Sequence, residues 1–87
     1  RRQRQMCIRD RLVACVQEVD IKSHYVWKNK LCNDSEILIL MKTTNELYED
    51  LKARLLEIHP YDTPEIVRID ISDGSTEYLS WIKAVTR

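Results

Sequence analysis

The residues best suited to chemistry lie together in one short stretch, His-Pro-Tyr-Asp-Thr-Pro-Glu-Ile at positions 59–66. It carries an imidazole, a phenol and two carboxylates, and two prolines stiffen it. Pro60 keeps His59 out of the α region and ends a helix before it. Pro64 suits the first residue of a strand, because it cannot donate to a sheet ladder. The sequence therefore predicts a rigid polar corner, the kind of place where binding sites often lie. A plain connector whose polar groups cap nearby backbone is the alternative.

Two residues are candidate metal ligands, His59 and Cys15. A neutral imidazole binds copper and zinc, but a histidine at a helix C-terminus can also bond the last carbonyl groups. Cys15 lies in an apolar run, where a cysteine is usually an inert small hydrophobe. It would act as a thiolate ligand only beside a cationic neighbour. Each residue thus has a structural explanation beside the functional one.

The cysteine count and the hydropathy suggest a cytoplasmic protein without a membrane partner. Cys7, Cys15 and Cys32 are an odd number with no close pair, which fits reduced thiols and not a disulfide framework or a zinc site. No apolar run approaches the ~20 residues that span a bilayer. No secretion signal is visible.

The charge distribution argues against a nucleic-acid partner. Residues 1–11 carry a net charge of +4 and residues 12–87 a net charge of −4. Neutralisation of phosphates supplies most nucleic-acid affinity, so an acidic body is a poor binder. The arginine-rich residues 1–11 have no clean hydrophobic period, and we expect them to be a leader outside a domain that spans residues 12–87.

Two strands and a turn are expected in the first half of the chain. The apolar run 12–16 predicts a buried strand, which continues as an alternating stretch through residues 19–27 with one buried face. Lys28-Asn29-Lys30 is a polar break in which Asn29 tolerates the left-handed conformation of a hairpin turn. Residues 36–42 are apolar nearly throughout, as in a central strand covered on both faces.

The second half predicts helix, strand and helix. Leu47, Leu51, Leu55 and Ile58 form the stripe of an amphipathic core helix, and residues 43–46 have the form of a capping box. Residues 65–71 alternate as in a strand, and a last helix starts at about residue 76. This order is typical of an α+β domain with helices on one face of an antiparallel sheet.

Several sequence blocks, taken in order, resemble the CutA divalent-cation-tolerance family. They are Leu-Val-Ala-Cys-Val at 12–16, Ser-x-Tyr-x-Trp-x-Asn-Lys at 23–30, the apolar strand at 36–43, the corner at 59–66, and Gly-x-x-x-Tyr-Leu-x-Trp-Ile at 74–82. The resemblance implies a ferredoxin-like split β-α-β fold, a homotrimer and a link to copper and other divalent metals. It also implies that a first strand and most of a first helix are missing, which would leave residues 65–71 without a partner on one edge.

The resemblance favours a non-enzymatic divalent-metal binding or tolerance protein. A small-molecule sensor with the trimeric architecture of PII signalling proteins is the alternative, by analogy of fold. An enzyme is not expected, because no nucleophile elbow, glycine-rich phosphate loop or His-Glu-x-x-His motif is present. A sensor would use an inter-subunit cleft of rings and a few polar groups, although the rings could simply pack in the core or an oligomer interface. The candidate cleft residues are Tyr25, Trp27, Lys42, Tyr61, Glu65, Tyr78 and Trp81.

Overall fold

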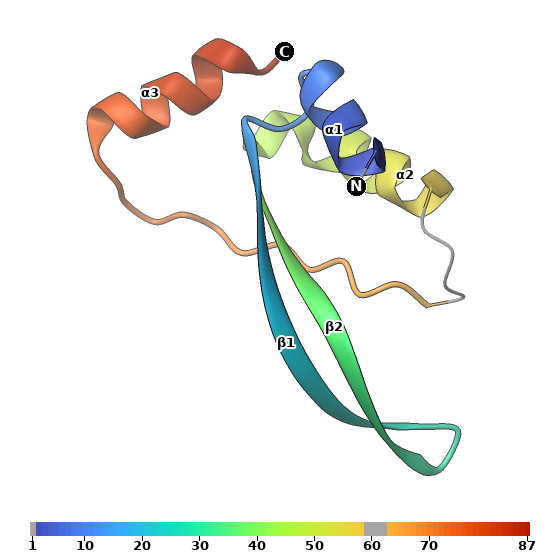
Figure 1. Ribbon diagram of the computed structural model, residues 1–87. Coiled ribbons are helices and arrows are strands. Elements are labelled where there is room, and N and C mark those ends of the chain that lie inside the picture. Colours follow the sequence, from blue (N-terminus) through green and yellow to red (C-terminus); the bar gives the residue numbers. More distant parts are fainter. Residues whose placement is uncertain (1, 59–62) are drawn as a thin grey trace.

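The computed structural model describes residues 2–58 and 63–87, which form an α+β arrangement as expected (Figure 1). The three α-helices of the described residues gather at one end of a long β-hairpin (Figure 1). None of the helices in these two ranges has the length and apolar character needed to cross a bilayer. In chain order the elements are α1 (Arg2–Arg9), β1 (Cys15–Trp27), β2 (Lys30–Lys42), a 3-10 turn (Asn45–Leu47), α2 (Tyr48–Ile58) and α3 (Thr76–Val85).

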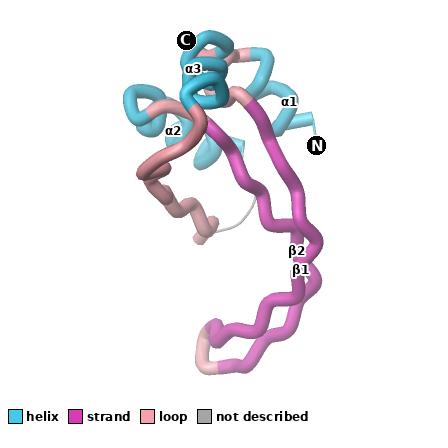
Figure 2. The backbone as a smooth tube through the Cα atoms, turned by 90° about the vertical axis from the view of Figure 1, so that its left-hand side faces the viewer, coloured by secondary structure: helices cyan, strands magenta, loops and turns pink. Residues whose placement is uncertain are grey.

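The hairpin is regular from its base to its tip. β1 and β2 pair antiparallel in a register that runs from Cys15 opposite Lys42 to Trp27 opposite Lys30. Lys28 and Asn29 have φ values of 51° and 65°, the left-handed pair that a two-residue turn of type I′ requires. The predicted turn is therefore confirmed, and its tip projects away from the helices (Figure 2).

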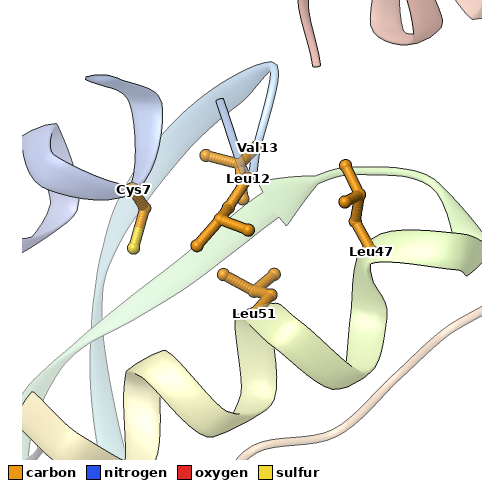
Figure 3. Close-up of a cluster of buried hydrophobic side chains, with 5 residues drawn as sticks. All are labelled: Cys7, Leu12, Val13, Leu47 and Leu51. Atoms are coloured by element: carbon orange, nitrogen blue, oxygen red, sulfur yellow. The ribbon is translucent and has the colours of Figure 1, made fainter. Parts of the chain in front are cut away.

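The hydrophobic core lies at the base of the hairpin, between the strands and the first two helices (Figure 3). Leu47 and Leu51 are buried in it, and Leu55 packs against it, which confirms the predicted leucine stripe. Val16 and Met41, opposite each other in the register, pack against the same cluster. The full cluster of buried side chains is Cys7, Leu12, Val13, Leu47 and Leu51.

The arginine-rich segment forms α1, and its side chains contact residues that follow residue 11. Cys7 has no exposed surface and contributes to the core. Arg4 pairs with Glu18 of β1 at 2.6 Å, and Asp10 pairs with Arg54 of α2 at 3.3 Å. The segment was expected to lie outside the domain because its charges obscure the helical period. In the structure Arg9 is exposed, while Cys7 faces inward.

The turn after α1 positions α3. The Arg11 guanidinium donates to the carbonyl oxygens of Val85 at 3.3 Å and Thr86 at 3.2 Å. The backbone N–H of Arg87 donates in return to the Arg11 carbonyl at 3.0 Å. At the other end of α3, the Ser75 side chain caps the helix by accepting from the backbone N–H of Tyr78. These bonds hold α3 beside the base of the hairpin.

Two local predictions are wrong. Residues 65–71 are not a strand, since the described sheet contains only β1 and β2 and a strand exists only through its ladder bonds. The capping box at 43–46 does not form either. The Thr43 hydroxyl instead donates to the Leu12 carbonyl at 2.6 Å, and Thr44 takes the N-cap position without a side-chain bond.

The expected burial of the hairpin is also wrong for a single chain. Residues 36–42 were expected to be covered on both faces, yet Leu38 and Leu40 are exposed. The β1 face expected to be buried is open as well: Val19, Tyr25 and Trp27 are all exposed. The helices reach only the base of the hairpin, so most of its length has no cover within the chain.

Candidate functional site

Three polar side chains share one face of the hairpin at its base. Cys15 and Lys42 are directly opposite each other in the register, and Gln17 follows Cys15 by two residues. Because side chains alternate along a strand, these three lie on the face opposite Val16 and Met41, which point to the core. The buried cluster therefore covers one face of the hairpin at its base. The opposite, polar face remains open to contact with α3.

Helix α3 places two aromatic rings at this polar face. The Tyr78 hydroxyl lies 3.8 Å from the Cys15 sulfur. The Lys42 ammonium lies 5.9 Å from the centroid of the Tyr78 ring and donates to the Gln17 side-chain oxygen at 2.6 Å. Trp81, one helical turn after Tyr78, tilts against it with ring centroids 5.7 Å apart. We name Cys15, Gln17, Lys42, Tyr78 and Trp81 the base cluster.

The base cluster combines a thiol, a cation and two half-exposed rings. Tyr78 and Trp81 each expose 41% of their surface, so a ligand could reach both rings. Cys15 is partly buried. By contrast, burial raises the pKa of the Cys7 thiol, which keeps that residue protonated within the core. Of these two cysteines, Cys15 is the one placed to contact a ligand.

Four predicted site residues thus come together: Cys15, Lys42, Tyr78 and Trp81. Tyr25 and Trp27 do not join them, because both lie toward the tip at the far end of β1. The Tyr25 hydroxyl donates to the Asp34 carboxylate, and this bond raises the pKa of Tyr25 to about 12. Within one chain the predicted cleft is therefore split between the two ends of the hairpin.

The remaining predicted residues lie at or beyond the break in the described chain. His59 and Tyr61 fall outside the described residues. Glu65 is exposed at the start of the extended segment and lines a groove beside β2. Lys42 of the base cluster lines the same groove.

The described side chains do not form a metal site by themselves. Protein metal sites usually need three or more ligands. Residues 2–58 and 63–87 contain no group of three histidine, cysteine, aspartate or glutamate side chains that could hold a metal ion. A site that uses Cys15 would need further ligands from His59 or from another subunit.

Sequence reasoning missed two residues that organise these features. Gln17 holds the Lys42 ammonium, and Asp34 accepts from Tyr25. Both could have been found by completing the register, because a two-residue turn at Lys28-Asn29 fixes which residues face each other across the hairpin. On one face of a hairpin, a long side chain can reach the residue diagonally across from it. Lys42 reaches Gln17 in this way, and Tyr25 reaches Asp34.

Residues 1–85 of this chain match the family described as "CutA1 divalent ion tolerance protein". A relative from Pyrococcus horikoshii named "Divalent-cation tolerance protein CutA" is 39% identical over 80 residues, which cover 92% of this chain and 78% of the relative. The match includes the arginine-rich helix α1, in agreement with the packing of Cys7.

Solved structures agree with this fold. The PII-like protein CutA from Nostoc sp. has a TM-score of 0.93 at 33% identity, over 99% of this chain and 85% of that one. The periplasmic divalent cation tolerance protein CutA from Archaeoglobus fulgidus has a TM-score of 0.92 at 31% identity, over 97% of this chain and 82% of that one. With the sequence match and both structures in agreement, the chain belongs to the CutA1 divalent ion tolerance family.

Proposed function

We propose that this protein is a non-enzymatic, cytoplasmic homotrimer that binds a divalent metal ion, with copper as the preferred ion. The observation that carries the proposal is the position of Cys15, a partly buried thiol on the open face of the hairpin base. Family membership supplies the link to divalent ions in general. The choice of copper rests on ligand chemistry.

A thiol and an imidazole suit both copper and zinc, and of these two ions Cu(II) has the higher affinity for a given set of ligands. Thiolates are soft ligands, and imidazole suits copper, zinc, iron and nickel. In this proposal Cys15 supplies the sulfur and His59 supplies the nitrogen. The remaining positions are completed by groups from a neighbouring subunit, because one thiol and one imidazole are too few for a stable site.

The trimer is supported by an uncovered apolar face. By register parity, Val19, Tyr25 and Trp27 of β1 share a face with Leu38 and Leu40 of β2. All five are exposed in the single chain. An apolar strand face this long is an aggregation hazard unless another subunit covers it. The same packing would bring the tip residues Tyr25 and Trp27 of one subunit to another subunit.

Calorimetric titration of the purified protein with Cu(II), combined with a measurement of molar mass, tests this proposal. We expect a trimer that binds copper, and we expect His59→Ala to weaken the affinity at least about tenfold, or ~1.4 kcal/mol. His24→Ala is the matched control, because His24 is an exposed histidine well along β1 from Cys15. Equal copper affinity in both variants would show that the 59–66 corner is structural.

A small-molecule sensor is the second candidate, and the Lys42 ammonium against the Tyr78 ring favours it. A cation beside two half-exposed rings suits a small anionic or nucleotide ligand better than a metal ion. In a trimer, Tyr25, Trp27, Tyr61 and Glu65 would complete the cleft around Lys42, Tyr78 and Trp81. Titration with ATP and with inorganic phosphate distinguishes the candidates: Lys42→Ala abolishes anion binding in the sensor but leaves copper affinity unchanged in the metal-binding protein.

A further inference from the structure

Arg11 occupies a backbone position that glycine normally takes. The end of α1 forms a Schellman motif, in which the Arg11 N–H donates to the Ile8 carbonyl at 3.0 Å. The Leu12 N–H completes the motif by donating to the Cys7 carbonyl, also at 3.0 Å. Arg11 therefore lies in the left-handed region, with a φ of 61°. Because glycine adopts this conformation without steric cost and arginine does not, the backbone gives no reason for an arginine here.

The Arg11 side chain supplies the reason, because it holds the last turn of α3. Its guanidinium donates to the carbonyl oxygens of Ala84 at 3.5 Å, Val85 at 3.3 Å and Thr86 at 3.2 Å. A helix leaves such carbonyl groups without partners at its C-terminus, and its dipole favours a cation there. The Arg11 carbonyl also accepts from the Arg87 N–H, so side chain and backbone both fix the end of α3 beside the end of α1 (Figure 1).

The position of this last turn determines where the aromatic residues of α3 lie. Tyr78 and Trp81 are the two members of the base cluster that α3 supplies, and the Tyr78 hydroxyl contacts the Cys15 sulfur at 3.8 Å. Ile82 lies between these rings and the last turn and is buried. A helix is rigid over so few residues, so a shift of its C-terminal end moves both rings.

We propose that Arg11 is a positioning residue of the base cluster, which sets the access to Cys15 and the place of both rings from the turn between α1 and β1. This inference rests on the proposed function in one respect, since it takes the base cluster to be the binding site. Arg11 contacts no ligand and acts through α3. Strained backbone positions of this kind persist where a functional site needs them.

Arg11→Gly separates the two roles of this position, because glycine suits the left-handed turn but cannot hold α3. Alkylation of the full chain with iodoacetamide, followed by peptide mass mapping, reports on each thiol separately. Cys7 lies in the core beside the turn, Cys15 in the base cluster and Cys32 near the hairpin tip. We expect Cys15 to react several times faster in Arg11→Gly than in the native protein, while Cys7 stays protected and the rate at Cys32 is unchanged.

Lys28→Gly is the matched control. Lys28 is also a left-handed residue, with a φ of 51°, but it lies in the hairpin turn, far from α3 (Figure 2). We expect this variant to keep the native rate at Cys15. Equal Cys15 rates in Arg11→Gly and the native protein overturn the proposal. A matching rise at Cys7 also overturns it, because Arg11 would then only hold the fold together.

Titration with ATP and with Cu(II) tests whether the position of α3 matters for binding. Helix α3 carries Tyr78 and Trp81, the rings of the sensor's cleft, but none of the proposed copper ligands. We therefore expect Arg11→Gly to weaken ATP binding at least about tenfold and to leave the Cu(II) affinity unchanged. Equal ATP affinity in the two proteins, or an equal loss for both ligands, overturns the proposal.

The two kinds of measurement keep this proposal distinct from the proposed function. A native protein that fails to bind one of these probes contradicts the function tied to that probe. The alkylation rates then decide the role of Arg11, because they need no ligand.

Discussion

The Tyr78 hydroxyl lies 3.8 Å from the Cys15 sulfur, although the two residues are 63 positions apart in the sequence. The contact joins the first turn of α3 to the first residue of β1. It depends on the bonds that hold the end of α3 to Arg11 and on the capping of its start by Ser75. The base cluster is therefore a product of tertiary structure, and its thiol is the natural place to test the proposed metal function.

Cys15→Ala is expected to lower Cu(II) affinity about tenfold, because it removes the sulfur ligand. Cys32→Ala is the matched control. Cys32 is also a partly buried thiol on the same face of the hairpin, but it donates to the Lys30 carbonyl near the tip. Titration calorimetry under anaerobic conditions measures both variants. If the two substitutions change the affinity equally, Cys15 has no special role in metal binding.

Leu51→Ala is expected to destabilise the fold by ~2–5 kcal/mol, because it opens a cavity in the buried cluster. Leu51 is only 5% exposed, whereas Leu56 on the same helix is 53% exposed. Leu56→Ala should therefore change the free energy of unfolding by no more than ~0.5 kcal/mol. Urea denaturation of the two variants checks the difference. Similar losses of stability would mean that α2 presents a different face to the core.

The elements that sequence patterns predicted correctly are those fixed by local chemistry. Asn29 supplied the turn because it tolerates a positive φ. The leucine spacing indicated α2, and Ser75 marks the start of α3 where turn residues end. In each case neighbours within a few residues determine the conformation, so the sequence pattern is sufficient.

The errors concern features that depend on distant partners. Residues 65–71 have the alternation of a strand, but alternation cannot supply a neighbouring strand. Thr43 has the sequence of a capping residue, but the Leu12 carbonyl competes for its hydroxyl. Cys7 was overlooked because arginines surround it, and only the packing of α1 on the core reveals its burial. The same limit applies to the pairing of Cys15 with Tyr78.

The hairpin tip is expected to lose stability at high pH. The Asp34 carboxylate accepts a hydrogen bond from Tyr25 and raises the pKa of the phenol from 10.0 to about 12. A raised pKa means that the folded state favours the protonated phenol. This contribution is complete below pH 10 and disappears as the pH rises toward about 12.

Tyrosinate absorbance and thermal midpoints measured across that range check this expectation. Asp34→Asn should return the Tyr25 pKa toward its ordinary value, and Tyr25→Phe should remove this part of the pH dependence. Identical titration curves for the native protein and Asp34→Asn would show that the hydrogen bond is not present in solution.

Leu38→Glu is expected to convert the trimer to monomers at micromolar concentration. Leu38 pairs with Val19 on the uncovered apolar face, so a carboxylate there would be buried without a partner. Asn33→Glu, an exposed position of β2 on the opposite face, should leave the trimer intact. Sedimentation equilibrium gives the masses. A native protein that is already monomeric would contradict the proposed assembly directly.

The most direct test of the proposed function is the X-ray absorption spectrum of copper bound to the protein, prepared anaerobically. Cys15 and His59 predict a first shell that contains both sulfur and imidazole nitrogen, with the sulfur signal lost in Cys15→Ala and the imidazole signal reduced in His59→Ala. A first shell of oxygen ligands alone, unchanged in both variants, would contradict a metal site at these residues.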